Sequence, residues 1–396
     1  MGTYSSPFVE SGQDVVVVDW LRTAIGRAHP EKGVFRDTHP STLLARCFED
    51  LIARTGIDAG LVEDVIVGCP QPFGVQGRNI ARNAWLQAGF PVEVPATTID
   101  RRCGSAQSAI AYASGLIASG MHEIVIAAGV EHMGKVPLSA PVKIAEFFGD
   151  PWTQELRDRF DFVPQGISAE LIAEQWDISR AEMDELAVTS HQLASKADES
   201  GRLAEEIIAI DTPNGVVTHD QGIRPDTNLE ALSALRTPFR DDGRLTAASS
   251  SQISDGAGAM LLMSARKARE LGLRGRARIL DQVTVGVDPI LMLTGPIPAT
   301  RKLLQRSGMS MADIGVSEVN EAFASVVLAW QRELDADMST VNVNGGAIAL
   351  GHPVGMTGAR LVGTIVNELE HRDKEIGLVT MCCGGGLGTG HLIQRL

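Results

Sequence analysis

The sequence has few cysteines, few aromatic residues and no excess of positive charge, and each scarcity excludes a class of protein. Its five Cys include no Cys-x-x-Cys pair, which argues against a disulfide scaffold and against a zinc or thioredoxin-like motif. The formal net charge of -14 argues against binding to nucleic acid or to an anionic membrane. No apolar run reaches the ~20 residues that a membrane-spanning helix needs. Residues 1–14 lack the layout of a signal peptide, so we expect a cytoplasmic protein.

The composition otherwise describes an ordinary globular chain that is rich in glycine. It has 396 residues, of which 44% are hydrophobic, 21% are charged and 41 are Gly. At about 150 residues per domain, this length is enough for two or three domains, each with its own core. The position of the glycines is therefore more informative than their number.

Strand and helix patterns alternate in the first third of the chain and again in the last third. Buried strands are predicted near residues 15–19, 65–67, 97–99 and 124–128, and helices near residues 42–54, 79–88 and 103–118. The last third repeats this order, with strands near residues 278–285 and 341–343, helices near residues 299–306, 325–334 and 355–371, and a terminal hairpin over residues 378–393. The alternation predicts the α/β class with a mostly parallel sheet, built as a duplicated unit.

The middle of the chain differs in composition and in its hydrophobic pattern. It carries more charge, and its helices are amphipathic; Ser179 and Glu182 form a capping box for one that extends to about residue 199. We interpret residues 122–249 as an excursion from the first domain that covers a ligand. The predicted N-terminal domain therefore combines residues 1–121 with 250–276, and the C-terminal domain spans residues 277–396.

Cys103 stands where a predicted strand ends and a helix of small residues begins. A thiol at a helix N-terminus has a lowered pKa, because free N–H groups and the helix dipole stabilise its thiolate. Gly104 and Ser105 leave room for a ligand beside it. Taken alone, Cys103 is equally consistent with a buried core thiol.

His352 is surrounded by glycines, with Gly351 before it and Pro353 after it. A lone His is more often a satisfied structural group than a catalyst. Glycine at this density indicates unusual backbone angles or close approach to a ligand. An imidazole beside a thiol is a common way to generate a nucleophilic thiolate.

Two further motifs have weaker chemistry on their own. Cys382 begins a glycine-rich turn that does not have the spacing of a dinucleotide-binding loop, although its N–H groups could bind an oxyanion. Asn320 opens Asn-Glu-Ala-Phe-Ala after a strand-like segment, and by itself it is most simply a helix N-cap.

Together, these four blocks resemble the signature blocks of the thiolase family. They occur in the family's order with family-like intervals, and the resemblance extends from about Val15 to Leu396. Two departures are small: Ala106 stands where many members have Gly, and Cys383 occupies a variable position. The resemblance implies two duplicated α/β domains in five layers, α-β-α-β-α, with an inserted loop domain.

The resemblance also implies a role for each residue. Cys103 is the nucleophile that takes the acyl group from a 3-ketoacyl-CoA, and His352 activates it and donates to the oxygen of the leaving acetyl-CoA enolate. Asn320 holds a water that completes this oxyanion hole. Cys382 is the general acid and base at the enolate carbon. The N–H groups of Cys103 and Gly384 form a second oxyanion hole.

Coenzyme A is the implied co-substrate, with no permanently bound cofactor and no metal. Ser251 matches the position that contacts the pantetheine arm, and Arg224 matches a residue near the CoA nucleotide. Such an arginine would supply the local positive charge that a chain of net charge -14 needs for a phosphate-bearing ligand. Without the resemblance, Arg224 is equally consistent with a solvated loop charge.

The implied activity is thiolytic cleavage of 3-ketoacyl-CoA by an acetyl-CoA C-acyltransferase that forms a homodimer or homotetramer. The segments 293–301 and 342–353 are most similar to actinobacterial thiolases of fatty-acid and steroid degradation. Three alternatives are a biosynthetic acetoacetyl-CoA thiolase, a decarboxylating ketosynthase, and a non-catalytic acyl-CoA-binding protein. The ketosynthase alternative does not explain a second thiol at Cys382.

Overall fold

The first unit of the fold contributes five main strands to one large sheet, and the short strands β2 (Gly26–Arg27) and β6 (Ile207–Ile208) pair with β9 and β1 at its side. The computed structural model describes residues 14–396, so the prediction about a signal peptide concerns residues that lie largely outside this range. The five main strands are β1 (Val15–Thr23), β3 (Asp64–Gly68), β4 (Ala96–Ile99), β5 (Ile124–His132) and β9 (Ser254–Ser264). They lie in the order β1-β9-β5-β3-β4, and β3 runs parallel to both of its neighbours.

The C-terminal half repeats this topology. Its strands β10 (Ala277–Gly286), β11 (Val316–Val319), β12 (Ile376–Cys383) and β13 (Leu387–Arg395) lie in the order β10-β13-β12-β11. As in the first half, an antiparallel trio is followed by a parallel pair. The antiparallel pairing of β1 with β10 joins the halves into a single sheet. This topology confirms the predicted duplication. The prediction of a mostly parallel sheet is wrong, because antiparallel pairings such as β1 with β9, β5 with β9 and β12 with β13 outnumber the parallel ones.

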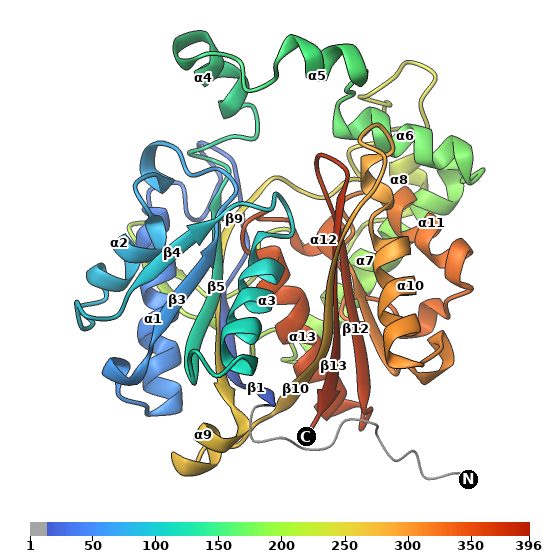
Figure 1. Ribbon diagram of the computed structural model, residues 1–396. Coiled ribbons are helices and arrows are strands. Elements are labelled where there is room, and N and C mark those ends of the chain that lie inside the picture. Colours follow the sequence, from blue (N-terminus) through green and yellow to red (C-terminus); the bar gives the residue numbers. More distant parts are fainter. Residues whose placement is uncertain (1–13) are drawn as a thin grey trace.

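Helices cover both sheet halves and also fill the space between them (Figure 1). The outer helices are α1 (Pro40–Thr55) and α2 (Ile80–Gln87) on one side, and α10 (Pro296–Ser307) and α11 (Ala324–Leu334) on the other. Between the halves, α3 (Ser105–Ala118) packs against α13 (Thr357–His371), and each also contacts strands of both halves. The predicted α-β-α-β-α layering is therefore confirmed.

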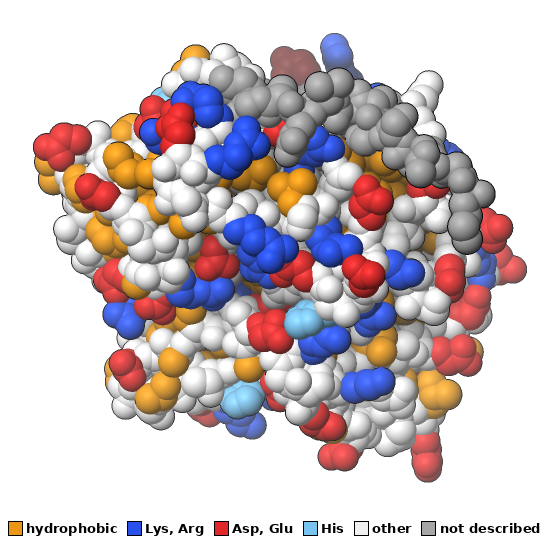
Figure 2. Space-filling view, turned by 90° about the horizontal axis from the view of Figure 1, so that it is seen from below, with side chains coloured by type: hydrophobic (Ala, Val, Ile, Leu, Met, Phe, Trp, Pro, Cys, Tyr) orange, Lys and Arg blue, Asp and Glu red, His pale blue; other side chains and the backbone are white. Residues whose placement is uncertain are grey.

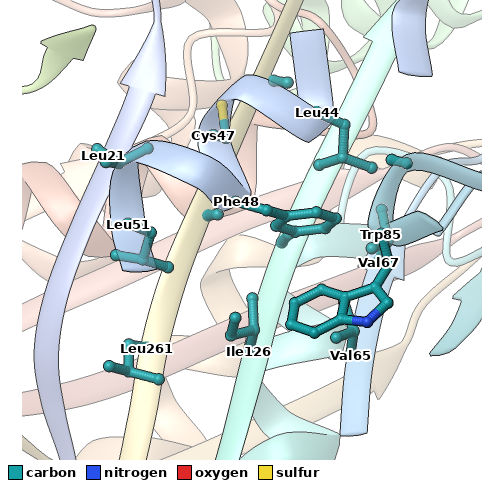
Figure 3. Packing of buried hydrophobic residues seen from close by; sticks show 14 of the residues in the cluster. Leu21, Leu44, Cys47, Phe48, Leu51, Val65, Val67, Trp85, Ile126 and Leu261 are labelled. Atoms are coloured by element: carbon teal, nitrogen blue, oxygen red, sulfur yellow. The ribbon is translucent and has the colours of Figure 1, made fainter. Parts of the chain in front are cut away.

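The outer core of the first half shows why the chain folds this way. Phe48 of α1 meets Trp85 of α2 edge to face, with ring centroids 5.8 Å apart (Figure 3). Both rings are fully buried over strand residues such as Val67 and Ile126. Cys47 and Cys69 belong to this cluster, which agrees with a packing role for both thiols.

The middle of the chain forms a separate group of helices. It contains α4 (Ala140–Phe148), α5 (Gln154–Arg159), α6 (Gln165–Gln175), α7 (Arg180–Glu199) and α8 (Leu229–Ser233), with a small hairpin of β7 (Ile210–Thr212) and β8 (Gly215–Val217). The capping box predicted for Ser179 and Glu182 is present at α7. Because β5 is a central strand of the sheet, the excursion begins after His132, later than the predicted boundary at residue 122.

Three local predictions need correction. The helix predicted from Cys103 begins at Ser105, because Cys103 lies in the preceding turn. The segment 341–343 forms only isolated bridges, not a strand. Asn320 is not a helix N-cap, since α11 begins four residues later in the chain at Ala324. The last two errors have one cause: the chain here is held by side-chain hydrogen bonds of Asn342, which local patterns do not reveal.

Truncating Phe48 tests the outer core. Phe48→Ala should lower the free energy of unfolding by about 3–5 kcal/mol, because it removes a fully buried ring and leaves a cavity. Chemical denaturation monitored by circular dichroism measures the change. The control is Leu86→Ala on α2, where the side chain is 42% exposed and the change should stay within about 0.5 kcal/mol. Equal effects of the two substitutions would contradict this account of the core.

Candidate active site

Cys103 lies in a tight turn between β4 and α3. Asp100 accepts the N–H of Arg102 at 2.7 Å, and the N–H of Gly104 bonds to the carbonyl of Arg101 at 3.1 Å. Arg102 has a positive φ of 51°, a strained conformation for a non-glycine residue. The turn therefore holds the thiol at the N-terminal end of α3.

Two backbone N–H groups converge on the sulfur of Cys103. One belongs to Cys103 itself and the other to Gly384, in the turn between β12 and β13. Both stabilise the thiolate, as does the charge of Arg102. Burial acts in the opposite direction and is the largest effect, raising the pKa of the Cys103 thiol to about 11. The prediction of a lowered pKa is thus wrong for the ligand-free site, because the thiol is almost completely desolvated.

Cys382 is the last but one residue of β12, and it lies near Cys103. Its thiol is fully buried, and burial together with the nearby Cys103 thiolate raises its pKa well above the ordinary value. A group held protonated in this way can act as a proton donor to a reacting carbon. The two thiols come from opposite halves of the duplicated fold.

Cys383 has a structural position beside the same turn. A Cβ atom placed on Gly104 would lie 2.6 Å from the sulfur of Cys383 and 2.8 Å from Cγ2 of Thr389. The N–H of Gly104 acts on this sulfur, and the hydroxyl of Thr389, which donates to Oε1 of Gln107 at 2.6 Å, lies beside the turn. Gly104 is therefore required for the turn to pack against β12 and β13.

His352 is a buried imidazole with a partner on each ring nitrogen. Nδ1 lies 2.6 Å from the hydroxyl oxygen of Thr357, and the amide nitrogen of Asn320 lies 3.3 Å from Nε2. The Thr357 hydroxyl donates to the carbonyl of Pro353 at 2.9 Å, so it accepts from Nδ1–H. The proton is thereby assigned to Nδ1, and the lone pair of Nε2 accepts the long hydrogen bond from the Asn320 amide, which it can exchange for a proton when it acts as a base. Burial, with the charge of Arg360, lowers the pKa of His352 to about 3, so the ring is neutral at pH 7.

Asn320 directly follows β11 in the chain. Its N–H bonds to the carbonyl of Thr380 at 3.1 Å, which places it at the ends of the paired strands β11 and β12. Its side-chain oxygen Oδ1 is buried without a hydrogen-bond partner in the described residues. Such an atom normally bonds an ordered water, and it therefore marks a place for one.

Glu321, the next residue, anchors this segment and had no assigned role in the sequence. Its buried carboxylate accepts from the hydroxyl of Ser190 at 2.7 Å, the amide of Asn342 at 3.0 Å and the N–H of Ile348 at 3.1 Å. These bonds join α7 of the excursion to the segments that hold Asn320 and His352. Glu321 therefore positions the segments that carry Asn320 and His352.

The glycines around His352 mainly allow this loop to pack closely against other segments of the same chain. Gly351 has a φ of 110°, which matches the predicted unusual backbone, and a Cβ there would lie 2.3 Å from the hydroxyl of Ser254. A Cβ on Gly355 would lie 2.2 Å from the carbonyl of Val130 in β5. The glycine density thus brings the His352 loop against strands of the first half, instead of leaving space for a ligand at those positions.

Arg224 belongs to a second, cationic cluster. Its N–H bonds to Nδ1 of the buried His191 at 3.2 Å, and the charge of Arg27 acts on both residues. Burial and the two guanidinium charges lower the pKa of His191 to about 4. Neither arginine has an ion pair within residues 14–396. The sequence prediction included Arg224 but not Arg27.

Ser251 lies between the two clusters. Its N–H bonds to the carbonyl of Ala322, and the neighbouring Gln252 accepts the N–H of His352 at 3.1 Å. Arg27 pairs with Ser254 across the short strand β2 (Gly26–Arg27), three residues beyond Ser251. One segment of chain therefore connects the thiol site with the cationic cluster.

A second charged region lies at the opposite end of the molecule and has its arginines already paired. Figure 2 shows the end of the molecule away from α4 and α5, where basic and acidic side chains are interspersed. A cavity of about 550 Å³ is lined by Arg54, Arg276, Asp19 and Glu370, but these arginines already pair with the two acids. Among the described residues, no group of His, Cys, Asp and Glu is arranged to hold a metal ion, and no helix is long and apolar enough to cross a membrane.

Comparison with known proteins decides the family. Residues 15–266 match the family model of the thiolase N-terminal domain, and residues 273–395 match that of the thiolase C-terminal domain. The chain belongs to the thiolase family. It is therefore an acyltransferase of the thiolase class, which confirms the resemblance predicted from the four sequence blocks.

Individual relatives are similar over nearly the whole chain. The steroid 3-ketoacyl-CoA thiolase FadA6 of Mycobacterium tuberculosis is 45% identical over 389 residues, covering 97% of this chain and 94% of that protein. The 3-ketoacyl-CoA thiolase of Colwellia psychrerythraea is 42% identical, covering 97% and 100% of the two chains. The crystal structure of the Bacillus anthracis acetyl-CoA acetyltransferase superposes with a TM-score of 0.87 at 36% identity, covering 98% and 100%.

The contact between Gly104 and Cys383 gives a prediction for this thiolase. Gly104→Ala should lower kcat/KM for thiolysis by about 10²-fold, because a methyl group in contact with the sulfur displaces Cys103 by a fraction of an ångström or more. Steady-state kinetics with a 3-ketoacyl-CoA measure the change. Gly115→Ala on the same helix is the control, since a Cβ there meets nothing within 4 Å and activity should be retained. Full activity of Gly104→Ala would refute the proposed constraint.

Proposed function

We propose that this thiolase cleaves a 3-ketoacyl-CoA with coenzyme A through an acyl thioester on Cys103. The observation that carries the proposal is the convergence of two backbone N–H groups on the Cys103 sulfur, with a second protonated thiol, Cys382, beside it. Such an arrangement provides a nucleophile, an oxyanion hole and a proton donor in one place. The His352–Asn320 pair supplies a base and a hydrogen-bond donor.

The first half-reaction forms the acyl-enzyme. Nε2 of His352 takes the proton of Cys103, and the thiolate sulfur attacks the 3-keto carbon. The tetrahedral oxyanion accepts hydrogen bonds from the N–H groups of Cys103 and Gly384. Its collapse breaks the bond between C2 and C3, and the electron pair moves into the thioester to give the enolate of acetyl-CoA.

His352 and Asn320 stabilise that enolate. The imidazolium formed in the first step donates Nε2–H to the enolate oxygen, and a water bound to the unpartnered Oδ1 of Asn320 donates a second hydrogen bond. The developing negative charge offsets the burial that otherwise keeps the His352 pKa low. Cys382 then gives its proton to the enolate carbon, and acetyl-CoA leaves.

The second half-reaction transfers the acyl group to coenzyme A. The Cys382 thiolate takes the proton of the CoA thiol, whose sulfur attacks the carbonyl carbon of the Cys103 thioester. The same two N–H groups hold the oxyanion. The intermediate expels the Cys103 sulfur, which recovers its proton from His352, so the enzyme returns to its starting state.

The cationic cluster fits the phosphate end of coenzyme A. Arg27 and Arg224 present guanidinium groups without acidic partners in the described residues, and Ser251 lies on the segment that leads from them to His352. A phosphate is a favourable partner for such groups. We assign Arg224 and Arg27 to the phosphates and the Ser251 hydroxyl to the pantetheine arm, with CoA acting only as co-substrate.

Each unit of the fold contributes different residues to the proposed site. The N-terminal unit contributes Cys103, the C-terminal unit contributes Asn320, His352, Cys382 and Gly384, and the excursion contributes Arg224. The names of the relatives support fatty-acid or steroid degradation as the setting, and we propose a cytoplasmic homodimer or homotetramer. Sizing chromatography with light scattering determines the oligomeric state.

Two cysteine variants test the mechanism. In wild-type enzyme, mass spectrometry after a 3-ketoacyl-CoA is added without CoA should find one acyl group on Cys103, and Cys103→Ala should carry none. Cys382→Ser should still be alkylated by iodoacetamide at Cys103, but exchange of acetyl-CoA methyl protons with deuterated water should slow by at least 10²-fold, because the general acid and base is lost.

The buried thiols provide the control for this experiment. Cys47 and Cys69 are completely buried with raised pKa values, and they should remain unmodified under the same conditions. Acyl transfer by Cys103→Ala at the wild-type rate would overturn the choice of nucleophile. Unchanged proton exchange in Cys382→Ser would overturn the role of Cys382 alone.

Removing the cationic groups tests the CoA assignment. Arg224→Ala and Arg27→Ala should each raise KM for CoA by about 10-fold while kcat changes little, because a charge-assisted hydrogen bond to a phosphate is lost far from the reacting atoms. The control is Arg236→Ala, an exposed arginine of the same excursion for which KM should not change. The same assay with dephospho-CoA identifies which variant has lost a contact to the 3′-phosphate; unchanged KM in both variants would refute the assignment.

A further inference from the structure

The side chain of Gln165 reaches the turn that holds the proposed oxyanion hole. Gln165 is the first residue of α6, and a Cβ atom placed on Gly384 would lie 2.6 Å from its amide nitrogen Nε2. Gly384 is the residue whose N–H bonds to the Cys103 sulfur. The Gln165 amide therefore lies beside the place where an acyl group on Cys103 begins.

The Gln165 side chain has no hydrogen bond within residues 14–396 and is only partly exposed. The residue that follows it in the chain packs into an apolar cluster. The adjacent Gly166 packs against the ring of Phe239, which meets Phe323 edge to face at 5.8 Å. Phe323, Met292, Leu293 and Cys382 belong to one buried apolar cluster. The Gln165 amide, which has no hydrogen-bond partner in the described residues, thus lies at the edge of an apolar cluster and near the Cys103 thiol.

We propose that Gln165 is a specificity-determining residue that selects acyl groups bearing an oxygen atom a few bonds from the thioester carbon. This inference rests on the proposed function, because it takes Cys103 as the site of acylation. The amide can donate to a ketone or carboxylate oxygen and accept from a hydroxyl. A purely hydrocarbon acyl group would displace water from the amide and leave it without a partner, which disfavours that substrate.

A pair of substrates of equal length tests the inference. The probes are 3-ketohexanoyl-CoA, which ends in a methyl group, and 3-ketoadipyl-CoA, which ends in a carboxylate; 6-hydroxy-3-ketohexanoyl-CoA is the neutral oxygen-bearing probe. The measured quantity is the ratio of kcat/KM for each oxygen-bearing substrate to kcat/KM for 3-ketohexanoyl-CoA. Gln165→Met, which replaces the amide by an apolar group of similar size, should lower this ratio by about 10-fold or more.

The controls separate a specificity role from a structural one. Gln175→Met, at the exposed far end of the same helix, should leave the ratio unchanged. A substitution that merely disturbs Gly384 lowers kcat/KM for all substrates together and does not move the ratio. Gln165→Asn keeps the amide on a shorter side chain and should retain part of the preference.

The outcomes also distinguish this inference from the proposed function. If wild-type enzyme cleaves the probes through acyl-Cys103 and Gln165→Met keeps the wild-type ratio, the role of Gln165 is refuted and the proposed function stands. If neither these probes nor longer or cyclic 3-ketoacyl-CoA substrates acylate Cys103 in the wild type, the proposed function itself fails. A ratio that falls for both oxygen-bearing probes supports the inference, and a ratio that falls for neither overturns it.

Discussion

The contact between the turn before α3 and the hairpin of β12 and β13 determines the geometry of the whole site. Gly104 lies against the sulfur of Cys383, and the N–H of Gly384 reaches the sulfur of Cys103. Neither half of the duplicated fold contains the whole proposed site, because Cys103 comes from one half and Asn320, His352, Cys382 and Gly384 come from the other. The two halves must therefore meet at ångström accuracy, and the layer formed by α3 and α13 between them provides the rigid packing that makes this accuracy possible.

The duplicated topology explains where the groups lie. β11 and β12 are parallel, so Asn320 and Cys382 emerge at the same end of the sheet. Figure 1 shows the turn between β12 and β13 at the end of the molecule that also carries α4, α5 and α6. Because the excursion leaves the sheet after β5, it brings its helices over this end, with Gln165 and Ser190 near the thiol site and Arg224 in the cationic cluster.

Burial sets the electrostatics of the resting site. It keeps both thiols protonated and His352 neutral, so the ligand-free enzyme holds no charge at the reacting atoms. A thiolate and an imidazolium become favourable here only when a substrate oxygen develops negative charge next to the hydrogen-bond donors of the site.

The sequence by itself determined the α/β class, the duplication and the family, and it led to the proposal of Cys103, Asn320, His352 and Cys382 as site residues, because hydrophobic periodicity and short motifs are local properties of the chain. It did not determine what depends on distant contacts. The raised pKa of Cys103 follows from burial between the two halves, and the role of Gly104 follows from a sulfur 279 positions later in the chain. Arg27, Glu321 and Gln165 are unremarkable in local sequence; only the tertiary structure placed their charge, hydrogen bonds or amide beside the site.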